Sequence, residues 1–243
     1  MTNRWRLWTN EDEDASFQMG LDALLLEDES APPTLRFYTW RPDALSLGYF
    51  QRFADIPATR AIGSIVRRQT GGGAIHHADE LTFALATTLD DPLYRGVVAD
   101  SYARIHTALA EAFRPFGVEA SLRGDASCTS DVEGTGMCFH ESTPLDLVWD
   151  RRKGVGSAQR RTKRRVLHHG SIKLGRTEHE AGVATLREGT PDVRPADVAR
   201  EIRRAFEQAF ALTFEPGEPT SDVCARARER GEAFGAADFV HKR

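Results

Sequence analysis

Two closely spaced turns between residues 145 and 174 constrain the fold more than any other feature of the sequence. Apolar residues alternate over 145–149 up to a turn at Arg151-Arg152, and a second strand begins near Lys153. The basic run 160–165 forms the next turn, and a third strand returns over 166–174. Strands joined by such short connections pair as hairpins. The pattern therefore predicts a hairpin-linked sheet in the second half of the chain.

Hydrophobic periodicity predicts the other elements. Within one strand, Leu81, Phe83 and Leu85 point one way, and the residues between them point the other way. Strands are expected over 34–40, 44–48, 62–68 and 80–87, helices over 12–27, 100–116, 195–212 and 220–233, and a polar loop over 123–136. Helices packed on hairpin-linked strands indicate an α+β fold. We expect a single domain over 1–243, with a core at about 15–215 and a short helical C-terminal tail.

The composition excludes several classes of protein. A net charge of −4 argues against a general nucleic-acid binder. No apolar run approaches the length of a membrane span, and the first ten residues carry no secretory signal, so the cytoplasm is the predicted compartment. The three cysteines, Cys128, Cys138 and Cys224, are too few for a disulfide framework and lack zinc-ligand spacing. Each is expected to be a free thiol, and a small buried side chain is the default role for any one of them.

Three successive glycines, Gly71-Gly72-Gly73, lie between two predicted strands. Each costs about 0.5–1 kcal/mol more to order than alanine, and a simple turn needs only one or two of them. Either the exposed N–H groups receive an anion or a carbonyl oxygen, or the segment is a flexible hairpin turn. The pattern matches neither the Walker loop nor the dinucleotide-binding fingerprint.

Cys138 precedes Lys153 by fifteen residues, and the intervening hairpin could bring the two together. A nearby ammonium favours the thiolate form of a cysteine, which is the nucleophilic form. The alternative is a buried Cys138 with a surface Lys153, and a pairing of Cys138 with His169 is also conceivable. His76, His77, His168 and His169 lack thiol or carboxylate partners at metal spacing, so no metal site is expected.

Taken together, these segments resemble the lipoate-protein ligases and octanoyltransferases, which are related to biotin-protein ligases. The resemblance covers roughly residues 15–215 and rests on the order and spacing of several short pieces. These are Arg67-Arg68-Gln69-Thr70-Gly71-Gly72-Gly73-Ala74-Ile75-His76-His77, Glu80-Leu81-Thr82-Phe83, Cys138-Phe139, Lys153-Gly154-Val155-Gly156-Ser157-Ala158-Gln159-Arg160 and His169-Gly170-Ser171-Ile172, with Met19, Asp22, Trp40 and Gly48-Tyr49-Phe50-Gln51 before them.

The resemblance implies a mixed, largely antiparallel sheet flanked by helices. It implies an acyl pocket in which Cys138 and Lys153 are catalytic. Substrate-binding residues would be Arg68, Thr70, Gly71, Gly72, Gly73, His77, Gly156, Ser157, Ala158, His169 and Gly170.

Three functions are compatible with this resemblance. In a cysteine-dependent octanoyltransferase, Cys138 takes the octanoyl group from acyl carrier protein as a thioester. It then passes the group to a lysine of a lipoyl domain, such as the glycine-cleavage H protein or the E2 subunit of a 2-oxoacid dehydrogenase, and no cofactor is needed. An ATP-dependent lipoate ligase would instead use ATP and magnesium to adenylate lipoate. Third, a non-catalytic relative would only bind carrier or lipoyl domains.

Two residues at the expected site favour different members of the family. Ligases typically carry an asparagine-aspartate pair where this chain has Cys138-Phe139, and they usually have an extra accessory domain, so Cys138 favours the transferase. Octanoyltransferases often carry an arginine at the position of Gly73. A glycine at this position is more typical of ligases, so Gly73 favours the ligase. The basic run 160–165 is either a solvated turn or a docking site for an acidic carrier protein or lipoyl domain. No nucleic acid or membrane partner is expected.

Overall fold

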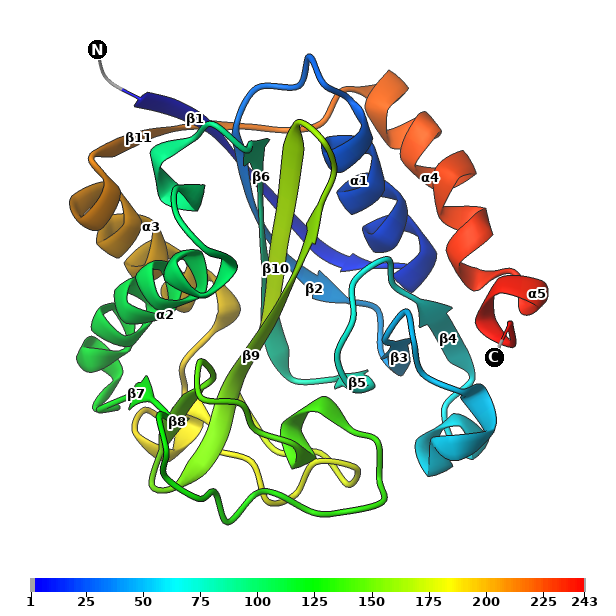
Figure 1. The fold of residues 1–243 in the computed structure, drawn as a ribbon, viewed down its shortest axis with the longest axis vertical. Coiled ribbons are helices and arrows are strands. Elements are labelled where there is room, and N and C mark those ends of the chain that lie inside the picture. The colour runs from blue at the N-terminus through cyan, green and yellow to red at the C-terminus, as the bar shows by residue number, and fades with distance from the viewer. Residues whose placement is uncertain (1–2, 243) are drawn as a thin grey trace.

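The computed structural model describes residues 3–242 and contains a mixed, largely antiparallel sheet of eight strands flanked by helices (Figure 1). The strands are β1 (Asn3–Glu13), β2 (Thr34–Trp40), β6 (Glu80–Thr88), β7 (Ser121–Leu122), β8 (Leu147–Trp149), β9 (Arg152–Arg161), β10 (Arg165–Lys173) and β11 (Leu212–Gly217). Their order is β11-β1-β2-β6-β10-β9-β8-β7. Only β1 pairs in parallel, with β11 on one side and β2 on the other, and the remaining neighbours are antiparallel. The predicted fold class is confirmed.

A second, three-stranded sheet carries the glycine loop. It consists of β3 (Ala44–Leu47), β4 (Ser64–Arg67) and β5 (Ile75–His77), in the order β4-β3-β5. The loop joins β4 to β5, which pair with opposite edges of β3, one parallel and one antiparallel. The chain must therefore cross from one edge of β3 to the other through the glycines.

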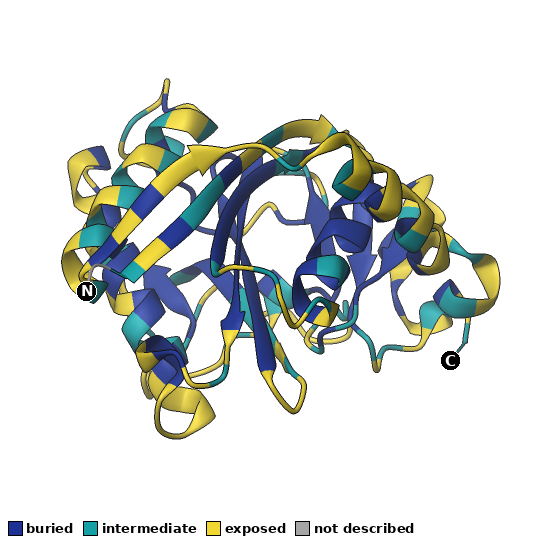
Figure 2. Cartoon of the chain, turned by 90° about the horizontal axis from the view of Figure 1, so that it is seen from above, coloured by how far each residue is buried: buried dark blue, intermediate teal, exposed yellow. Residues whose placement is uncertain are grey.

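Helices cover both faces of the large sheet (Figure 1). On one face, α2 (Val98–Phe113) and α3 (Pro195–Phe210) pack against the face of β6 that carries Leu81, Phe83 and Leu85. On the other, α1 (Ala15–Glu27) packs against Ala84 and Ala86, and α4 (Ser221–Gly235) packs on α1, followed by α5 (Ala237–Val240). The central strands β6 and β10 are buried along almost their whole length, as Figure 2 shows. The predicted alternation in β6 is confirmed, and it places small residues under α1 and large ones under α2 and α3.

The structure corrects several predicted boundaries. Residues 12 and 13 end β1 instead of starting a helix, because the strand pairs with β2 up to Glu13. The turn before β9 consists of Asp150 and Arg151, both with positive φ, one residue earlier than predicted. This is the geometry of a two-residue hairpin loop whose twist matches its strands. Strands β1 and β11 were not predicted, and Leu212 belongs to β11 instead of the preceding helix.

Helix α2 ends in a short 3₁₀ turn before Gly117, whose left-handed conformation stops it as predicted. Over residues 3–242, none of the helices has the length and apolarity needed to cross a membrane.

Candidate active site

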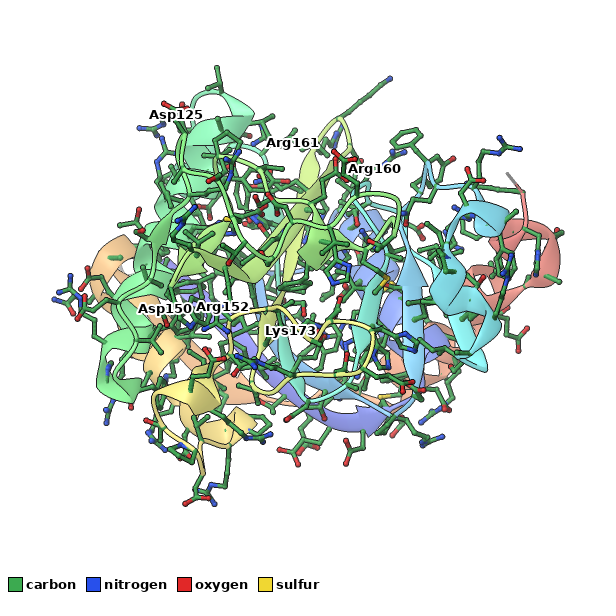
Figure 3. The ribbon with its side chains drawn as sticks, turned by 90° about the horizontal axis from the view of Figure 1, so that it is seen from below. Asp125, Asp150, Arg152, Arg160, Arg161 and Lys173 are labelled. Carbon is green, nitrogen blue, oxygen red and sulfur yellow. The ribbon has the colours of Figure 1, made fainter. Side chains whose placement is uncertain are left out.

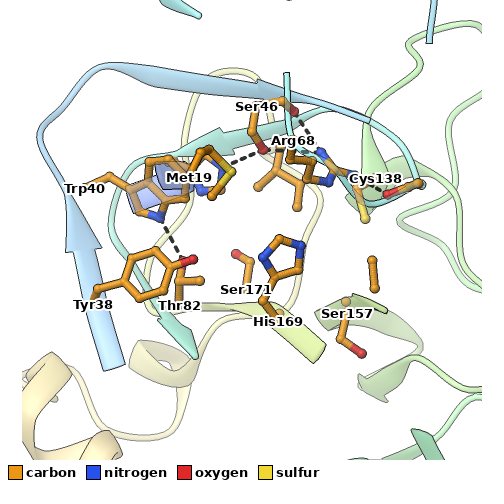
Figure 4. A pocket seen from close by; sticks show the side chains of 17 residues that line it. Met19, Tyr38, Trp40, Ser46, Arg68, Thr82, Cys138, Ser157, His169 and Ser171 are labelled. Atoms are coloured by element: carbon orange, nitrogen blue, oxygen red, sulfur yellow. Dashed lines mark hydrogen bonds between the residues drawn. The ribbon is translucent and has the colours of Figure 1, made fainter. Parts of the chain in front are cut away.

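An inner pocket lies where the small sheet, α1 and the centre of the large sheet meet. Figure 4 shows Met19, Tyr38, Trp40 and Thr82 towards one end of this pocket and Cys138 and Ser157 towards the other. The other lining residues are Ser46, Arg68, Gly71, Gly72, Ile75, His77, Gly156, Ala158, His169, Gly170 and Ser171. A second, more polar cleft adjoins it and shares Gly71, Gly72 and Cys138, among others, while adding Lys153 and Asp146. Cys138 thus stands where an apolar pocket opens into a polar cleft.

The glycine loop is held from behind by Arg68. Its buried guanidinium donates hydrogen bonds to the carbonyl oxygens of Ser46 (2.9 Å), Gly71 (2.8 Å) and Gly73 (2.7 Å). Burial lowers the pKa of Arg68 to about 10. These bonds exclude the alternative of an unanchored flexible turn.

In the described part of the chain, the carbonyls of Gly71 and Gly73 accept hydrogen bonds, whereas the amides of the loop donate none. Within the described residues, the N–H groups of Gly71, Gly72 and Gly73 donate no hydrogen bond to other protein groups. The loop lines both cavities beside Cys138. Adjacent backbone donors without protein partners, in a loop that lines a cavity, can bind an anion or a carbonyl oxygen and can stabilise an oxyanion.

Gly73 is required by the close approach of the Cys138 segment. The amide of Ala74 donates to Gly136 O (2.8 Å), and the amide of Cys138 donates to Ala74 O (2.7 Å). A Cβ atom on Gly73 would lie 2.6 Å from the backbone nitrogen of Cys138. The third glycine therefore lets the backbone of Cys138 pack directly on the loop.

Lys153 and Cys138 are neighbours, as the hairpin suggested. The Nζ atom of Lys153 lies 3.6 Å from Cys138 Sγ and donates to the carbonyl oxygens of Cys138 (2.8 Å) and Glu141 (3.0 Å) and to Asp146 Oδ2 (2.8 Å). Lys153 is buried and Cys138 is half-buried, which excludes the alternative of a surface lysine. A Cβ atom on Gly156 would lie 3.3 Å from this sulfur and 3.2 Å from Lys153 Nζ, so the missing side chain makes room for the pair.

His169 does not pair with Cys138. Its Nδ1 bonds Asp22 Oδ2 (2.9 Å) and its Nε2 bonds Thr70 Oγ1 (2.7 Å), so both ring nitrogens are engaged. Asp22 also binds the buried Arg36 and accepts a hydrogen bond from Tyr38 (3.0 Å). Burial raises the pKa of Asp22, but Arg36 and His169 together lower it by more, so the net shift of this pKa is downward. The network fixes His169 and Thr70 as parts of the pocket wall.

His77 forms another rigid part of this wall. It stacks on Trp40 with ring centroids 3.6 Å apart, and its nitrogens bond Glu80 Oε1 and Ser46 Oγ, both at 2.7 Å. Burial lowers the pKa of His77 to about 4, although Glu80 acts in the opposite direction. The ring is therefore neutral at physiological pH and holds the indole of Trp40 in place.

The hydroxyl of Ser157 is committed to two histidines, His106 on α2 (2.7 Å) and His168 on β10 (2.8 Å). Burial lowers the pKa of both, so both are neutral. His106 Nδ1 bonds the carbonyl of Leu145, which only accepts, so His106 Nε2 must accept the proton of Ser157. His168 Nε2 then donates to Ser157. These two bonds fix the position of the Ser157 hydroxyl at the pocket wall.

The histidines considered as metal ligands are all saturated by protein groups. His76 bonds Thr177 and Asp43, and His168 bonds Gln159 in addition to Ser157. Together with His77 and His169, these rings have no free nitrogen. Across the part of the chain that the structure describes, no group of three histidine, cysteine or acidic residues is arranged to hold a metal ion.

The basic run does not form one continuous charged surface. Arg165 is fully buried and donates to Leu25 O and Ala31 O near the end of α1, where helix carbonyls lack partners. Arg161 bonds Gln159 and Ser101, and Arg164 pairs with Glu29. In Figure 3, Arg160 and Arg161 lie towards the rim, whereas Lys173 lies near the centre. Within residues 3–242, the side chains of Arg160 and Lys163 are the ones in this run that form neither a hydrogen bond nor an ion pair.

The structure brings together all the residues predicted to form the site. Thr70 does not line either cavity but is hydrogen-bonded to His169, which lines the inner pocket. Gly73 and Lys153 line the polar cleft, and the other predicted residues line the inner pocket. Asp146, Tyr38 and Tyr102 were not predicted. Asp146 could have been found from the hairpin, because it directly precedes β8 and Val148 in that strand pairs with Lys153.

Residues 14–177 match the family model of the lipoyl protein ligase A/B catalytic domain, which is about two thirds of the chain. The chain belongs to this family. It is 34% identical to octanoyltransferase LipM of Moorella thermoacetica, with 98% of each chain covered. It is 36% identical to octanoyltransferase LipM of Kyrpidia tusciae, with 98% of this chain and 88% of the relative covered. The chain is therefore an acyltransferase, as predicted.

Solved structures of the family share this fold. A putative lipoate protein ligase of Thermoplasma acidophilum with bound lipoic acid superimposes with a TM-score of 0.78 at 20% identity, with 100% of each chain covered. A lipoate-protein ligase A bound with ATP gives a TM-score of 0.76 at 20% identity, with 99% of each chain covered. These likenesses confirm the predicted fold.

Proposed function

We propose that this enzyme transfers an octanoyl group from an acyl carrier protein through Cys138 to a lysine of a lipoyl domain. The observation that carries the proposal is the Lys153 ammonium 3.6 Å from the sulfur of Cys138, where the apolar pocket meets the polar cleft. The alkyl chain would lie between Cys138 and Trp40, and the carrier arm would enter through the cleft.

In the first half-reaction, the Cys138 thiolate attacks the carbonyl carbon of the donor thioester. The N–H groups of Gly71, Gly72 and Gly73 donate to no protein group among the described residues, and the loop lines the same cleft as Cys138, so these amides would stabilise the tetrahedral oxyanion. Collapse of this intermediate breaks the donor C–S bond, and the carrier thiolate leaves and takes a proton from solvent. The octanoyl group remains on Cys138 as a thioester.

In the second half-reaction, the neutral amine of the acceptor lysine attacks the same carbonyl. The amide bond forms, the C–S bond to Cys138 breaks, and the amine proton passes to solvent. Lys153 stabilises the departing thiolate by its charge. No ATP is needed, because the donor thioester is already activated.

Two observations favour transfer over ligation. The two relatives described above are octanoyltransferases, and the thiol of Cys138 sits beside an ammonium as a nucleophile requires. The ligase-like Gly73 has a packing reason that is independent of ATP, because Cys138 lies directly on it. ATP and magnesium are therefore not part of the proposal. The proposal places this reaction in the cytoplasm, as the sequence predicted.

Docking of the carrier would involve Arg160, which is exposed and lies 5.8 Å from the ring of Tyr49. Tyr49 contacts Phe50, and Phe50 in turn lies 3.7 Å from the Cβ position of Gly71. This series of contacts connects an exposed cation to the mouth of the site. Acidic surfaces of a carrier protein or lipoyl domain would be attracted there.

Intact-mass spectrometry after incubation with octanoyl-acyl carrier protein tests the proposal. We expect a mass gain of one octanoyl group, absent in Cys138→Ser, and loss of that gain on addition of a lipoyl domain. Cys128→Ser is the matched control, because Cys128 is also a free half-buried thiol but lies outside both cavities. Absence of an adduct, together with ATP-dependent lipoylation, would refute the proposal.

A further inference from the structure

The ammonium group of Lys153 is surrounded by three oxygen acceptors. Asp146 Oδ2 and Cys138 O lie 2.8 Å from Nζ, and Glu141 O lies at 3.0 Å. An ammonium has three N–H donors, which these three oxygens share with the sulfur of Cys138 at 3.6 Å. A neutral amine has only two donors for the same acceptors and no charge to balance the buried Asp146 carboxylate. The site is built for the charged form of Lys153.

Asp146 is the only charged oxygen ligand of the three. It is buried and lies directly before β8, and its Oδ2 also accepts the amide of Thr143 (2.7 Å). The Thr143 carbonyl in turn accepts the amide of Asp146 (3.1 Å). These two hydrogen bonds form a local turn that holds the Asp146 carboxylate in place without a contribution from Lys153.

We propose that Asp146 is a positioning residue that keeps Lys153 as a fixed ammonium beside Cys138, so that Lys153 acts as a cation and not as a proton acceptor. The role within acyl transfer rests on the function proposed above. The arrangement is a Cys138–Lys153–Asp146 triad in which the lysine takes no proton. The proton of the Cys138 thiol must then leave to solvent through the polar cleft.

The charged groups around Lys153 agree with this assignment. Burial alone lowers the pKa of Lys153, but Cys138 and Asp146 more than offset it, and the pKa is raised. His106 on α2 is neutral. Lys173 and Lys153 both approach the ring of Phe139, with their ammonium groups 4.6 and 5.5 Å from its centroid, respectively. Lys173 has its own carboxylates, Glu80 and Glu180, so it does not compete for Asp146.

The sequence makes a direct test practical, because its lysines are Lys153, Lys163, Lys173 and Lys242 only. Lysine-labelled NMR would follow each side-chain resonance with pH, and Lys153→Arg would assign the signal of Lys153. In Asp146→Asn we expect Lys153 to titrate about 1–3 pH units lower than in the parent protein. Asp131→Asn is the matched control, because it removes an exposed carboxylate that accepts a local hydrogen bond from Ser142.

Lys173 provides an internal check of folding in the same spectra. If its signal is unchanged while that of Lys153 moves in Asp146→Asn, the proposal is supported. If Lys153 titrates as in Asp131→Asn, the proposal is wrong. If Lys173 also moves, Asp146→Glu decides, because a retained charge should restore the titration of Lys153, and failure to restore it overturns the proposal.

The kinetic consequence separates positioning from a merely structural role. The single-turnover rate of Cys138 octanoylation should stay level at alkaline pH in the parent protein and fall at alkaline pH in Asp146→Asn. A uniform decrease at all pH values would mean that Asp146 only supports the fold. The NMR readout needs no acyl substrate, so failure to form an adduct would refute the proposed function without affecting this titration.

Discussion

Replacing Gly73 by alanine adds one methyl group at the place where the glycine loop touches Cys138, the proposed nucleophile. The new Cβ would lie 2.6 Å from the nitrogen and 2.8 Å from the Cα of Cys138, and 2.9 Å from Gly136 O. All three are backbone atoms, so no change of rotamer relieves the contact. Reaching an ordinary contact distance of 3.4 Å requires the segment to move by about 0.8 Å, the difference from 2.6 Å.

This displacement strains the two hydrogen bonds that hold Cys138 on the loop, from Cys138 N to Ala74 O and from Ala74 N to Gly136 O. A typical hydrogen bond contributes about 1 kcal/mol net, so the free energy of unfolding should fall by about 2 kcal/mol. The sulfur would also move relative to Lys153 and the loop amides. A misplacement of about 1 Å at a reacting group can cost about 10²-fold in rate.

The assay is the single-turnover rate of octanoyl loading on Cys138, followed by intact mass, with urea unfolding measured in parallel. Gly63→Ala is the control, because a Cβ there meets no atom within 4 Å and Gly63 lies outside both cavities. We expect Gly63→Ala to load at the parent rate and Gly73→Ala to load about 10²-fold more slowly. Equal rates in the two variants would show that this contact does not position the nucleophile.

Two further predictions concern pH and salt. Burial lowers the pKa of His77 to about 4, below the value of about 6.5 expected in the unfolded chain. The unfolded state therefore binds more protons between these values, and His77 should contribute a stability loss of about 3 kcal/mol as pH falls through this range. Urea unfolding at several pH values should give a smaller loss for His77→Gln, and an identical loss would contradict the assignment. Arg160→Glu should slow acylation by the carrier protein about 10-fold at low salt, with the difference vanishing at high salt. Octanoyl transfer from a small thioester should be unaffected, and equal slowing of both donors would exclude docking.

Much of the fold could be predicted from the sequence because most helices and strands depend on local patterns of apolar and polar residues. Alternation over 80–87 predicted which side chains of β6 face each layer. The short turn before β9 allowed a contact between Cys138 and Lys153 but left a surface lysine open, and only the family resemblance made the contact an expectation. The short strands β5 and β7 were not predicted, and neither were the two strands near the ends of the chain. Strands β1 and β11 pair with each other in parallel although they lie about 200 residues apart, and no local pattern specifies such a partner.

The roles of the charged residues likewise depend on distant partners that the local sequence does not specify. The five cations of the run 160–165 are indistinguishable in sequence, yet Arg165 is fully buried on α1 and Arg160 is exposed. Their roles depend on which distant carbonyl or carboxylate reaches each side chain. In the same way, Asp22 and His169 lie 147 positions apart and exclude a Cys138–His169 pair only because the fold joins them.

The sequence by itself determined the family, the sheet with helices on both faces, and the residues that gather at the site, because these follow from local periodicity and from the order of short segments. Only the tertiary structure decided how those residues can act. It showed Lys153 held by Asp146, Ser157 held by two histidines and, within residues 3–242, the amides of Gly71, Gly72 and Gly73 without protein partners. The physical reason is that burial and hydrogen-bond partners set charge and proton position, and both come from residues far apart in the chain.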